Sequence, residues 1–296
     1  MVIGILGQSG YVGGQLDEAF GRAGLTTLPI RHREVDVDNS QALARSLQQL
    51  SVDFLVNAAG FTGRPNVDAC EFQKMECLQG NAVLPGVVRE ACERIGVPFA
   101  HISSGCIYSG RRVDGAGFAE EDPPNFSFRA GRCSFYSGCK ALGEEVLEGC
   151  ESCYVWRLRI PFDHRDGPRN YLSKLMRYDR LLDAENSLTH LGDFARSCVA
   201  CIENQLPFGI YNLTNHGSVT TREVVTMLRA TIARGHDFQF FEDEDEFMRE
   251  AAVAPRSNCV LDTSKAISAG LPMRPIREAL QDAISHWQSE SVGAEC

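Results

Sequence analysis

Short apolar runs alternate with amphipathic stretches along most of the chain. The run Val2 to Leu6 predicts a buried strand, and the helical spacing of apolar residues after it predicts a helix to about Ala23. The alternation continues, with strands predicted at 26–30, 35–38, 53–56, from 99, at 154–160 and at 209–214, and helices at 40–49, 81–95, around 136, at 171–178 and at 219–232. Strands that alternate with helices predict a parallel sheet covered by helices on both faces.

The expected fold class is therefore α/β, a Rossmann-type doubly wound parallel sheet with a smaller α/β substrate domain. We expect residues 1–160 to form the dinucleotide-binding domain, to which a later segment near 188–215 returns. The composition shifts at the polar loop 161–170, and residues 161–296 are expected to be mainly the substrate domain. No clean linker separates the two parts, so the second is expected to be built onto the first.

A glycine turn follows the first predicted strand. Gly7, Gly10 and Gly13 have the spacing Gly-x-x-Gly-x-x-Gly, and Tyr11 and Val12 begin the next helix. Glycines allow a tight turn and a close backbone approach, and a helix N-terminus favours a pyrophosphate. The alternative is a turn with only a structural role. Its place directly after the first strand favours a dinucleotide site.

The end of the second predicted strand bears on the choice of cofactor. Arg31 and Arg33 stand where an acid would bind a ribose 2′-hydroxyl, and arginines suit a 2′-phosphate instead. NADPH is therefore the expected cofactor, and the alternative is two solvated surface arginines. Asp36 and Val37 lie at the end of the short strand predicted at 35–38 and are expected to line the adenine pocket.

Small residues follow the strand predicted at 53–56. Ala58, Ala59 and Gly60 come directly after Asn57, at what would be the carboxyl end of that strand. Small side chains at this edge of a parallel sheet leave room for a cofactor. We therefore expect these three residues to contact the dinucleotide.

Tyr136 and Lys140 are four residues apart in a predicted helix, so both side chains lie on one face. A lysine ammonium beside a phenol favours the phenolate, and we expect Lys140 to lower the pKa of Tyr136 towards a range useful for proton transfer. Taken alone, this spacing is also common on solvated helix faces. The glycine turn and the residues around the pair favour a catalytic role.

Composition limits the classes of function. The chain of 296 residues has a formal net charge of −10, which argues against general nucleic-acid binding and against docking on an anionic membrane. No run reaches the roughly 18 apolar residues of a membrane span, and the first residues lack the basic region of a signal peptide. The 12 cysteines suggest reduced thiols in a cytoplasmic protein, and no metal site is expected.

These features together resemble an extended short-chain dehydrogenase/reductase. Within it, the chain is similar to the plant and giant-virus UDP-4-keto-6-deoxyglucose 3,5-epimerase/4-reductases of UDP-rhamnose synthesis, which are related to dTDP-4-dehydrorhamnose reductase. The matching segments are residues 59–68, 105–108, 120–122, 124–126, 135–137, 168–170, 177–178, 254 and 256–258, together with the glycine turn, Ser104 and Lys140.

The resemblance implies roles in ketone reduction. Tyr136 is then the proton donor to the C4 oxygen of the sugar, and Lys140 lowers its pKa and holds the nicotinamide ribose. Ser104 is expected to hydrogen-bond the same oxygen. Asn81 matches an asparagine that supports the proton relay, although a buried structural amide explains it equally well.

Epimerisation requires a second acid/base set that moves protons at the carbons beside the ketone. Cys106 is two residues beyond Ser104 and is expected to reach the same sugar, although a small buried thiol is the plain alternative. In the rhamnose-type enzymes its partner is a lysine, which corresponds to Lys174. The related GDP-fucose synthase uses a histidine, which would make His164 the partner.

The expected partner is a nucleotide sugar, UDP-linked rather than dTDP- or GDP-linked, and a homodimer remains open. The residues expected to bind this substrate are Thr62, Arg64, Asn66, Ser104, Gly105, Cys106, Asn170, Lys174 and Arg256. Two other functions are compatible with the resemblance: reduction alone, or a regulatory subunit like that of methionine adenosyltransferase. The complete acid/base set favours catalysis.

Overall fold

The computed structural model describes residues 1–64 and 66–289, and its centre is a parallel six-stranded sheet. In order across the sheet the strands are β10 (Gly209–Asn212), β5 (Cys153–Leu158), β4 (Phe99–Ser104), β3 (Phe54–Asn57), β1 (Val2–Leu6) and β2 (Thr26–Ile30). All five pairings are parallel, and the chain order reverses between β1 and β3. In open α/β sheets, ligands bind at such a reversal, beyond the carboxyl ends of the strands.

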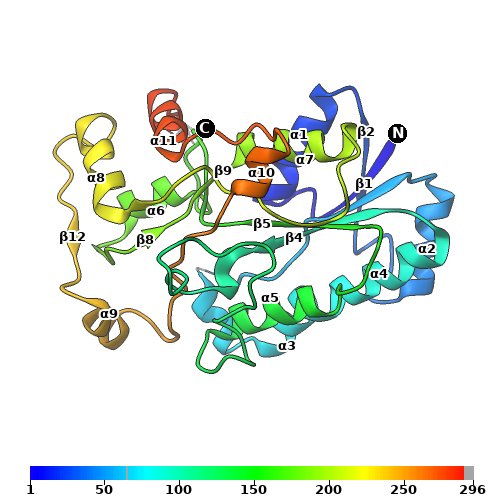
Figure 1. Cartoon of the computed structure of the whole chain (residues 1–296), viewed down its shortest axis with the longest axis horizontal. Helices are drawn as coiled ribbons and strands as arrows, with labels where there is room; N and C mark the ends of the chain where they lie inside the picture. Colours follow the sequence, from blue (N-terminus) through cyan, green and yellow to red (C-terminus); the bar gives the residue numbers. More distant parts are fainter. Residues whose placement is uncertain (65, 290–296) are drawn as a thin grey trace, which may run out of the picture.

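Helices cover both faces of the sheet, and this confirms the predicted α/β class. Figure 1 shows one layer on each side of it, α1 (Tyr11–Arg22), α7 (Leu191–Glu203) and α10 (Ser264–Ser268) on one face and α2 (Ser40–Gln49), α4 (Leu84–Ile95) and α5 (Phe135–Glu145) on the other. Neighbouring residues of a strand point to opposite faces. Ile5 therefore packs with Leu16 of α1, whereas Leu6 packs with Leu47 of α2.

Short elements connect the sheet to the loops around its carboxyl edge. They are the 3₁₀ helix η1 (Val67–Glu71), α3 (Lys74–Leu78), the π-helix η2 (Gln79–Val83) and the 3₁₀ helix η3 (Gly105–Ile107). A π-helical turn is uncommon and is often found at functional sites. The central residue of η2 is the fully buried Asn81.

A second lobe is built within residues 161–289 from very short strands and from the helices α6, α8, α9 and α11. Its elements are β6 (Pro161–Phe162), α6 (Tyr171–Arg177), β7 (Arg180–Leu181), β8 (Glu185–Asn186), β9 (Thr189–His190), β11 (Val219–Thr220), α8 (Thr221–Ala230), β12 (Gln239–Phe240), α9 (Glu244–Glu250) and α11 (Ile276–Ser285). A separate apolar cluster forms its core and includes Phe162, Leu172 and Leu228. The division into two domains at residue 160 stays a prediction, although β10 does return to the sheet beside β5.

Two local predictions have opposite outcomes. The sequence predicts Thr220 or Thr221 as the N-cap of the helix at 219–232, and Thr220 is the cap of α8 and forms a capping box with Glu223. The strand predicted at 35–38 is wrong, because Asp36 accepts a hydrogen bond from the amide of Asp38 in a turn. Val37 lies in this turn but is buried against α2. An apolar residue between two polar ones has the same pattern as a strand in the sequence.

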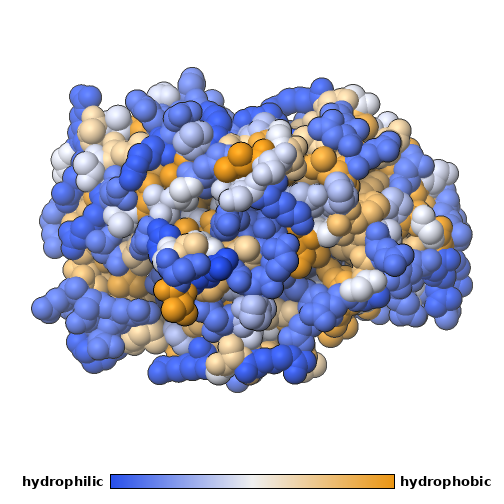
Figure 2. Space-filling view, viewed as in Figure 1, coloured by the Kyte–Doolittle hydropathy of each residue, from blue (hydrophilic) through white to orange (hydrophobic). Residues whose placement is uncertain are grey.

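Most of the face in Figure 2 is hydrophilic, with smaller apolar areas between the polar ones. Across residues 1–64 and 66–289, no helix combines the length and the apolar character needed to cross a membrane. The cysteines within these residues are all free thiols.

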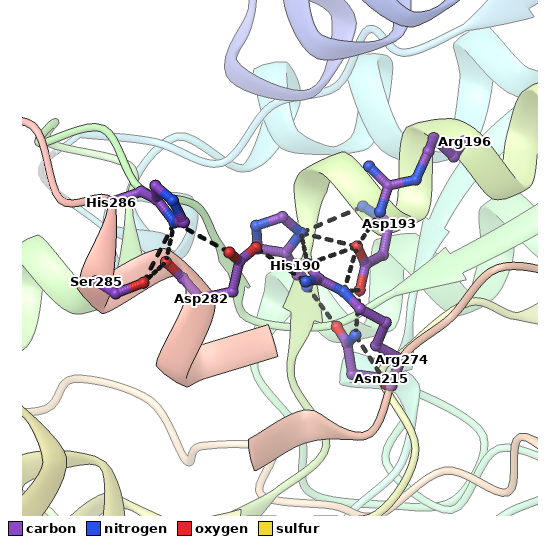
Figure 3. A network of polar contacts seen from close by, with 8 residues as sticks. All are labelled: His190, Asp193, Arg196, Asn215, Arg274, Asp282, Ser285 and His286. Carbon is purple, nitrogen blue, oxygen red and sulfur yellow. Dashed lines mark hydrogen bonds and ion pairs between the residues drawn. The ribbon is translucent and has the colours of Figure 1, made fainter. Parts of the chain in front are cut away.

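A buried carboxylate ties α7 to the segment that leads into α11 (Figure 3). Asp193 is fully buried and accepts from Arg274, from Arg196 at 2.5 Å and from the Asn215 amide at 2.8 Å. Burial by itself raises the pKa of Asp193, but the hydrogen bonds from His190 and Arg274 outweigh it, so the net pKa lies well below its ordinary value. Asp193 is therefore ionised at neutral pH and stabilises the folded state.

We expect Asp193→Asn to lower the free energy of unfolding by about 3 kcal/mol, because it leaves partly buried cations without their partner. This stabilisation is complete above the ordinary aspartate pKa of about 3.9 and is lost as the pH falls towards the lowered pKa. Urea unfolding of both proteins over a range of pH measures it. The control is Arg196→Gln, which removes a partner that is 53% exposed and should cost about 0.5 kcal/mol.

Candidate active site

A large cavity of about 610 Å³ lies at the carboxyl ends of β1, β3, β4 and β5 and continues between the two lobes. Gly10 and Ala58 line it after β1 and β3, Ser104 lines it at the end of β4, and Leu158 at the end of β5. The second lobe contributes the opposite wall, which includes Lys174 of α6. The cavity therefore occupies the place where the topology predicts a ligand.

The charges around this cavity are all of one sign. Of the residues in 1–64 and 66–289 that line it, none is an aspartate or a glutamate. Six are cations, Lys140, Arg159, Arg169, Lys174, Arg180 and Arg256. This local charge opposes the net charge of −10 of the chain. A cleft lined by one sign of charge attracts ligands of the other sign, so the cavity suits anions.

The glycine turn is tight, and its backbone approaches neighbouring backbone closely. Gly7 has a φ of +78°, which favours glycine, and a Cβ on Gly7 would lie 2.7 Å from the backbone nitrogen of Ala59. A Cβ on Gly13 would lie 2.1 Å from the carbonyl oxygen of Gly7. Gly10, the N-cap of α1, lines the cavity. The turn thus brings the N-terminus of α1 to the cavity, where its amides can meet a pyrophosphate.

The other predicted cofactor residues fall into two groups. Tyr11, Val12, Ala58, Ala59 and Gly60 line the cavity. Arg31, Asp36 and Val37 do not. Arg31 is exposed directly after β2 and pairs with Glu34 at 3.2 Å, and Val37 is 2% exposed. Their predicted cofactor contacts stay predictions.

Helix α5 carries Tyr136 and Lys140, and an ion pair with strand β5 fixes its position. Glu144 of α5 is held by Arg157 of β5 at 2.6 Å, and it also contacts the hydroxyl of Ser103. Both partners of the ion pair are more than nine-tenths buried. Removal of either charge would leave the other buried and unpaired, so this pair holds the helix firmly against the sheet.

The pKa of Tyr136 differs from the predicted direction. Burial raises it well above its ordinary value, and Cys106 adds to the increase, whereas Arg159 opposes it. Lys140 is buried and donates to the carbonyl oxygen of Ile102 at 3.1 Å, and burial lowers its pKa. The expectation that the pKa of Tyr136 lies below its ordinary value is therefore wrong, because burial disfavours the phenolate. Tyr136 is a protonated phenol at neutral pH.

Ser104 and Cys106 lie together at the end of β4. The amide of Cys106 donates to the hydroxyl of Ser104 at 3.2 Å, which caps η3. Burial raises the pKa of the Cys106 thiol, and Ser104, Lys140 and Arg159 act against the increase. Both side chains line the cavity. Gly105 between them does not line it, and a Cβ there would lie 2.8 Å from Leu261.

The two alternative partners of Cys106 are placed differently. Lys174 lines the cavity, and burial, followed by the charge of Arg169, lowers the pKa of its ammonium. His164 is not among the lining residues, and its carbonyl oxygen accepts from the amide of Gln288 at 2.7 Å. The position of the cavity therefore favours Lys174.

The predicted substrate residues are only partly brought together. Thr62, Asn66 and Arg256 line the cavity, whereas Arg64 is exposed outside it. Arg256 is held by both carboxylate oxygens of Asp68, each at 2.6 Å. Its guanidinium is therefore already paired in this structure.

Asn170 does not have the position expected of a substrate contact. It is fully buried, its oxygen caps α6 through the amide of Leu172, and its NH₂ group donates to Asp163 and Arg165. The neighbouring Arg169 lines the cavity instead and donates to the hydroxyl of Thr62 at 2.7 Å. The matched segment 168–170 indicated this place, but the wrong member of it was chosen.

Several residues of the site were not predicted. Arg159, Tyr171, Tyr178, Asn186 and Phe247 all line the cavity. A charged residue directly after a buried strand was a usable signal for Arg159, since β5 ends at Leu158. Tyr178 lies in the matched segment 177–178, whereas no local pattern marked Tyr171, Asn186 and Phe247.

Asn81 has the structural role that the sequence allowed and also borders the cavity, and its part in a proton relay stays a prediction. Its side chain donates to the carbonyl oxygen of Phe61 at 2.7 Å and accepts from the Phe61 amide at 3.3 Å. It also lines the cavity. It therefore fixes the loop after β3 with an amide that still borders the site.

Comparisons with known proteins agree with this geometry. Residues 1–289 match the family model described as the RmlD substrate binding domain. A bifunctional dTDP-4-dehydrorhamnose 3,5-epimerase/dTDP-4-dehydrorhamnose reductase of Arabidopsis thaliana is 33% identical over 281 residues, which cover 93% of this chain and 90% of that protein. A trifunctional UDP-glucose 4,6-dehydratase/UDP-4-keto-6-deoxy-D-glucose 3,5-epimerase/UDP-4-keto-L-rhamnose-reductase of the same plant is 31% identical, and the match covers 93% of this chain and 40% of that protein.

A solved structure extends the comparison to three dimensions. The UDP-rhamnose synthase of Acanthamoeba polyphaga mimivirus is 22% identical and superposes with a TM-score of 0.87, over 97% of this chain and 99% of that one. It has the same fold as this chain. The resemblance predicted from the sequence is thus confirmed, and this chain belongs to the RmlD substrate-binding domain family.

Proposed function

We propose that this oxidoreductase is an NADPH-dependent, bifunctional nucleotide-sugar 3,5-epimerase/4-keto-reductase that converts UDP-4-keto-6-deoxyglucose to UDP-rhamnose. The observation that carries the proposal is that one cavity is lined both by Ser104, Tyr136 and Lys140 and by the acid/base pair Cys106 and Lys174. The first set suits reduction of a ketone, and the second suits proton exchange at the carbons beside it.

The residues present fit a nicotinamide dinucleotide. The turn at Gly7 and Gly13 leaves no space for a Cβ, and it brings the N-terminus of α1 to the cavity at Gly10. Ala58 and Gly60 would border the rest of the cofactor, and Arg31 would meet a ribose 2′-phosphate after β2. When bound, NADPH supplies the hydride that reduces the C4 carbonyl.

In the reduction, Ser104 and Tyr136 act on the C4 oxygen. The Ser104 hydroxyl donates a hydrogen bond to that oxygen and polarises the carbonyl. Tyr136 gives its proton to the same oxygen as negative charge develops on it, and its raised pKa keeps that proton in place until then. Lys140 holds the adjoining ribose and supplies a positive charge close to the developing anion.

In the epimerisation, the C4 ketone makes the protons on C3 and C5 acidic, so one carbonyl activates both centres. Cys106, as the thiolate, removes a proton from one face of the ring, and Lys174 returns one from the other face. The lowered pKa of Lys174 suits this exchange, because it eases proton release near neutral pH. Ser104 remains on the C4 oxygen in both reactions, so the sugar does not have to move between them.

The cations that line the cavity suit the diphosphate of a nucleotide sugar as well as the phosphates of the cofactor. Arg169 is half-buried and lines the cavity, and within residues 1–64 and 66–289 it bonds to neutral oxygens of Thr62 and Gly63, which leaves its charge available. Arg256 would reach a diphosphate after release from Asp68. A UDP sugar is preferred to a dTDP sugar because the trifunctional plant relative acts on UDP-linked sugars, although the bifunctional one is named for dTDP-linked sugars.

The test is to incubate the protein with NADPH and UDP-4-keto-6-deoxyglucose, and in parallel with the dTDP-linked sugar. We expect NADPH oxidation and formation of UDP-rhamnose, with a higher kcat/KM for the UDP sugar. Oxidation only with a sugar that was epimerised beforehand would identify a reductase alone. No oxidation with any of these sugars would contradict the proposal and favour a regulatory subunit.

We expect Arg31→Ala to weaken NADPH binding roughly tenfold or more, the value of one charge-assisted hydrogen bond, and to leave NADH binding nearly unchanged. Fluorescence titration of both cofactors measures this. Arg94→Ala is a matched control, since Arg94 is also 47% exposed and pairs with a glutamate at 3.3 Å, against 3.2 Å for Arg31. Equal affinity of the native protein for NADPH and NADH would contradict the argument.

A further inference from the structure

Arg159 is a buried cation that has no carboxylate partner within residues 1–64 and 66–289. It follows β5, is 3% exposed and lines the cavity. Its N–H groups bond to neutral oxygens: the Asn186 side chain at 3.1 and 2.5 Å, the Ser257 hydroxyl at 3.1 Å, and the Ser257 carbonyl. A buried charge is costly unless an anion compensates it.

The contrast with Arg157 shows that this is not a general feature of the strand. Arg157 is buried to a similar degree, but Glu144 neutralises it with hydrogen bonds to Nε and Nη2. The two arginines are two residues apart, so only the one at the cavity keeps its charge uncompensated. The neutral acceptors orient the guanidinium without reducing its effect on the cavity.

The stem of Arg159 lies beside the residue that precedes Cys106. The Cδ of Arg159 lies 3.4 Å from the position that a Cβ on Gly105 would occupy, so its stem packs against the residue that precedes Cys106. Arg159 and Cys106 both line the cavity, and the Arg159 charge acts against the effect of burial on the Cys106 thiol. Arg159 therefore favours negative charge on that sulfur.

The backbone after Arg159 is strained. Ile160 has a φ of +40° and also lines the cavity. A β-branched residue rarely adopts this conformation, and such strain concentrates at functional sites. The backbone conformation of Ile160, directly after Arg159, is therefore energetically unfavourable in itself.

We propose that Arg159 forms an anion-stabilising site at the reacting end of the cavity, where its charge supports the Cys106 thiolate and the enolate of the keto sugar. This inference rests on the proposed function. In the first half-reaction the C–H bond at C3 or C5 breaks, the proton goes to the Cys106 sulfur, and the electron pair forms a C=C bond as the C4 oxygen becomes negative. In the second, Lys174 returns a proton to the carbon, and the carbonyl forms again.

The deciding variant is Asn186→Asp, which places a carboxylate against Arg159 and neutralises it without removing it. Alkylation of Cys106 by iodoacetamide is followed against pH by peptide mass spectrometry, with no cofactor or substrate present. Only the thiolate reacts, so the midpoint of the rate profile reports the Cys106 thiol itself. We expect the midpoint to rise by about one pH unit, which lowers the rate about tenfold at neutral pH.

Three further variants guard against a simple structural effect. Arg159→Met should raise the midpoint as Asn186→Asp does, whereas Arg159→Lys keeps a charge and should leave it near the native value. Arg256→Met removes a cavity arginine that is already paired with Asp68, and it should leave the midpoint unchanged. If Asn186→Asp does not fold, the difference between Arg159→Met and Arg159→Lys decides the question.

A native midpoint in both Asn186→Asp and Arg159→Met, or an equal shift in Arg159→Lys and Arg159→Met, would overturn the inference. These results leave the proposed function untouched, because thiol titration does not depend on turnover. A shifted midpoint supports the effect of Arg159 on the thiol. In deuterated buffer with the keto sugar, the same variants should then lose ring-proton exchange about tenfold, whereas exchange at the native rate would overturn the enolate part.

Discussion

Replacement of Tyr136 by Phe should lower the turnover of ketone reduction by about 10² to 10⁴ while NADPH binding stays nearly unchanged. The phenol is the only group proposed to give a proton to the C4 oxygen. Its raised pKa means that the proton is present at neutral pH, so the loss of the hydroxyl removes a proton donor rather than a charge. Stopped-flow oxidation of NADPH with the 4-keto sugar measures the effect.

A matched control is Tyr108→Phe. Tyr108 belongs to the cluster against which Tyr136 packs, but it does not line the cavity, and its hydroxyl donates to the carbonyl oxygen of Asp122 at 2.7 Å. This variant should lose about 1 kcal/mol of stability and keep near-native turnover. Native turnover in Tyr136→Phe would show that another group supplies the proton.

The strands of the sheet and the glycine turn could be predicted because their signals are local. A buried strand needs a run of apolar residues, and Gly7 must be a glycine because the turn requires its positive φ. The segment 168–170 does border the cavity, but through Arg169 and not through Asn170. The sequence could not separate the two, because the difference depends on which residue caps α6.

The parts of the site that were missed depend on contacts between distant segments. Arg159 keeps its uncompensated charge because Asn186 and Ser257, which are 27 and 98 residues away in the chain, offer it neutral oxygens. The pKa of Tyr136 is likewise set by burial against Cys106, which no spacing within α5 reports. Which side chains are buried, and which of them bond across the two lobes, can be seen only in the folded chain.

The positive charge of the cavity also depends on residues from distant segments, so it could not be predicted from the sequence. The composition gives a net charge of −10, and nothing in the linear sequence shows that the acids avoid one wall. The arginines and lysines of the cavity come from α5, the segment after β5, the loop before α6, α6, β7 and the segment 254–258 after α9. Folding gathers them, and the resulting field favours an anionic nucleotide sugar.

Reduction and epimerisation should be separable by mutation, since they share one ketone but use different acid/base groups. In deuterated buffer without NADPH, the native protein should exchange ring protons of the 4-keto sugar, seen as a mass increase. Cys106→Ala and Lys174→Ala should each lower this exchange at C3 or C5 by about 10² or more. Both variants should still reduce a sugar that was epimerised beforehand, because Ser104 and Tyr136 are intact.

The chain offers a matched control for the thiol. Cys259 is 1% exposed and lies in the same apolar cluster as Cys106, but it does not line the cavity, and its sulfur donates to the carbonyl oxygen of Gly105 at 3.1 Å. Cys259→Ala should therefore exchange ring protons at nearly the native rate. Native exchange at both carbons in Cys106→Ala would refute the role of this thiol, and native exchange in Lys174→Ala would return His164 as its partner.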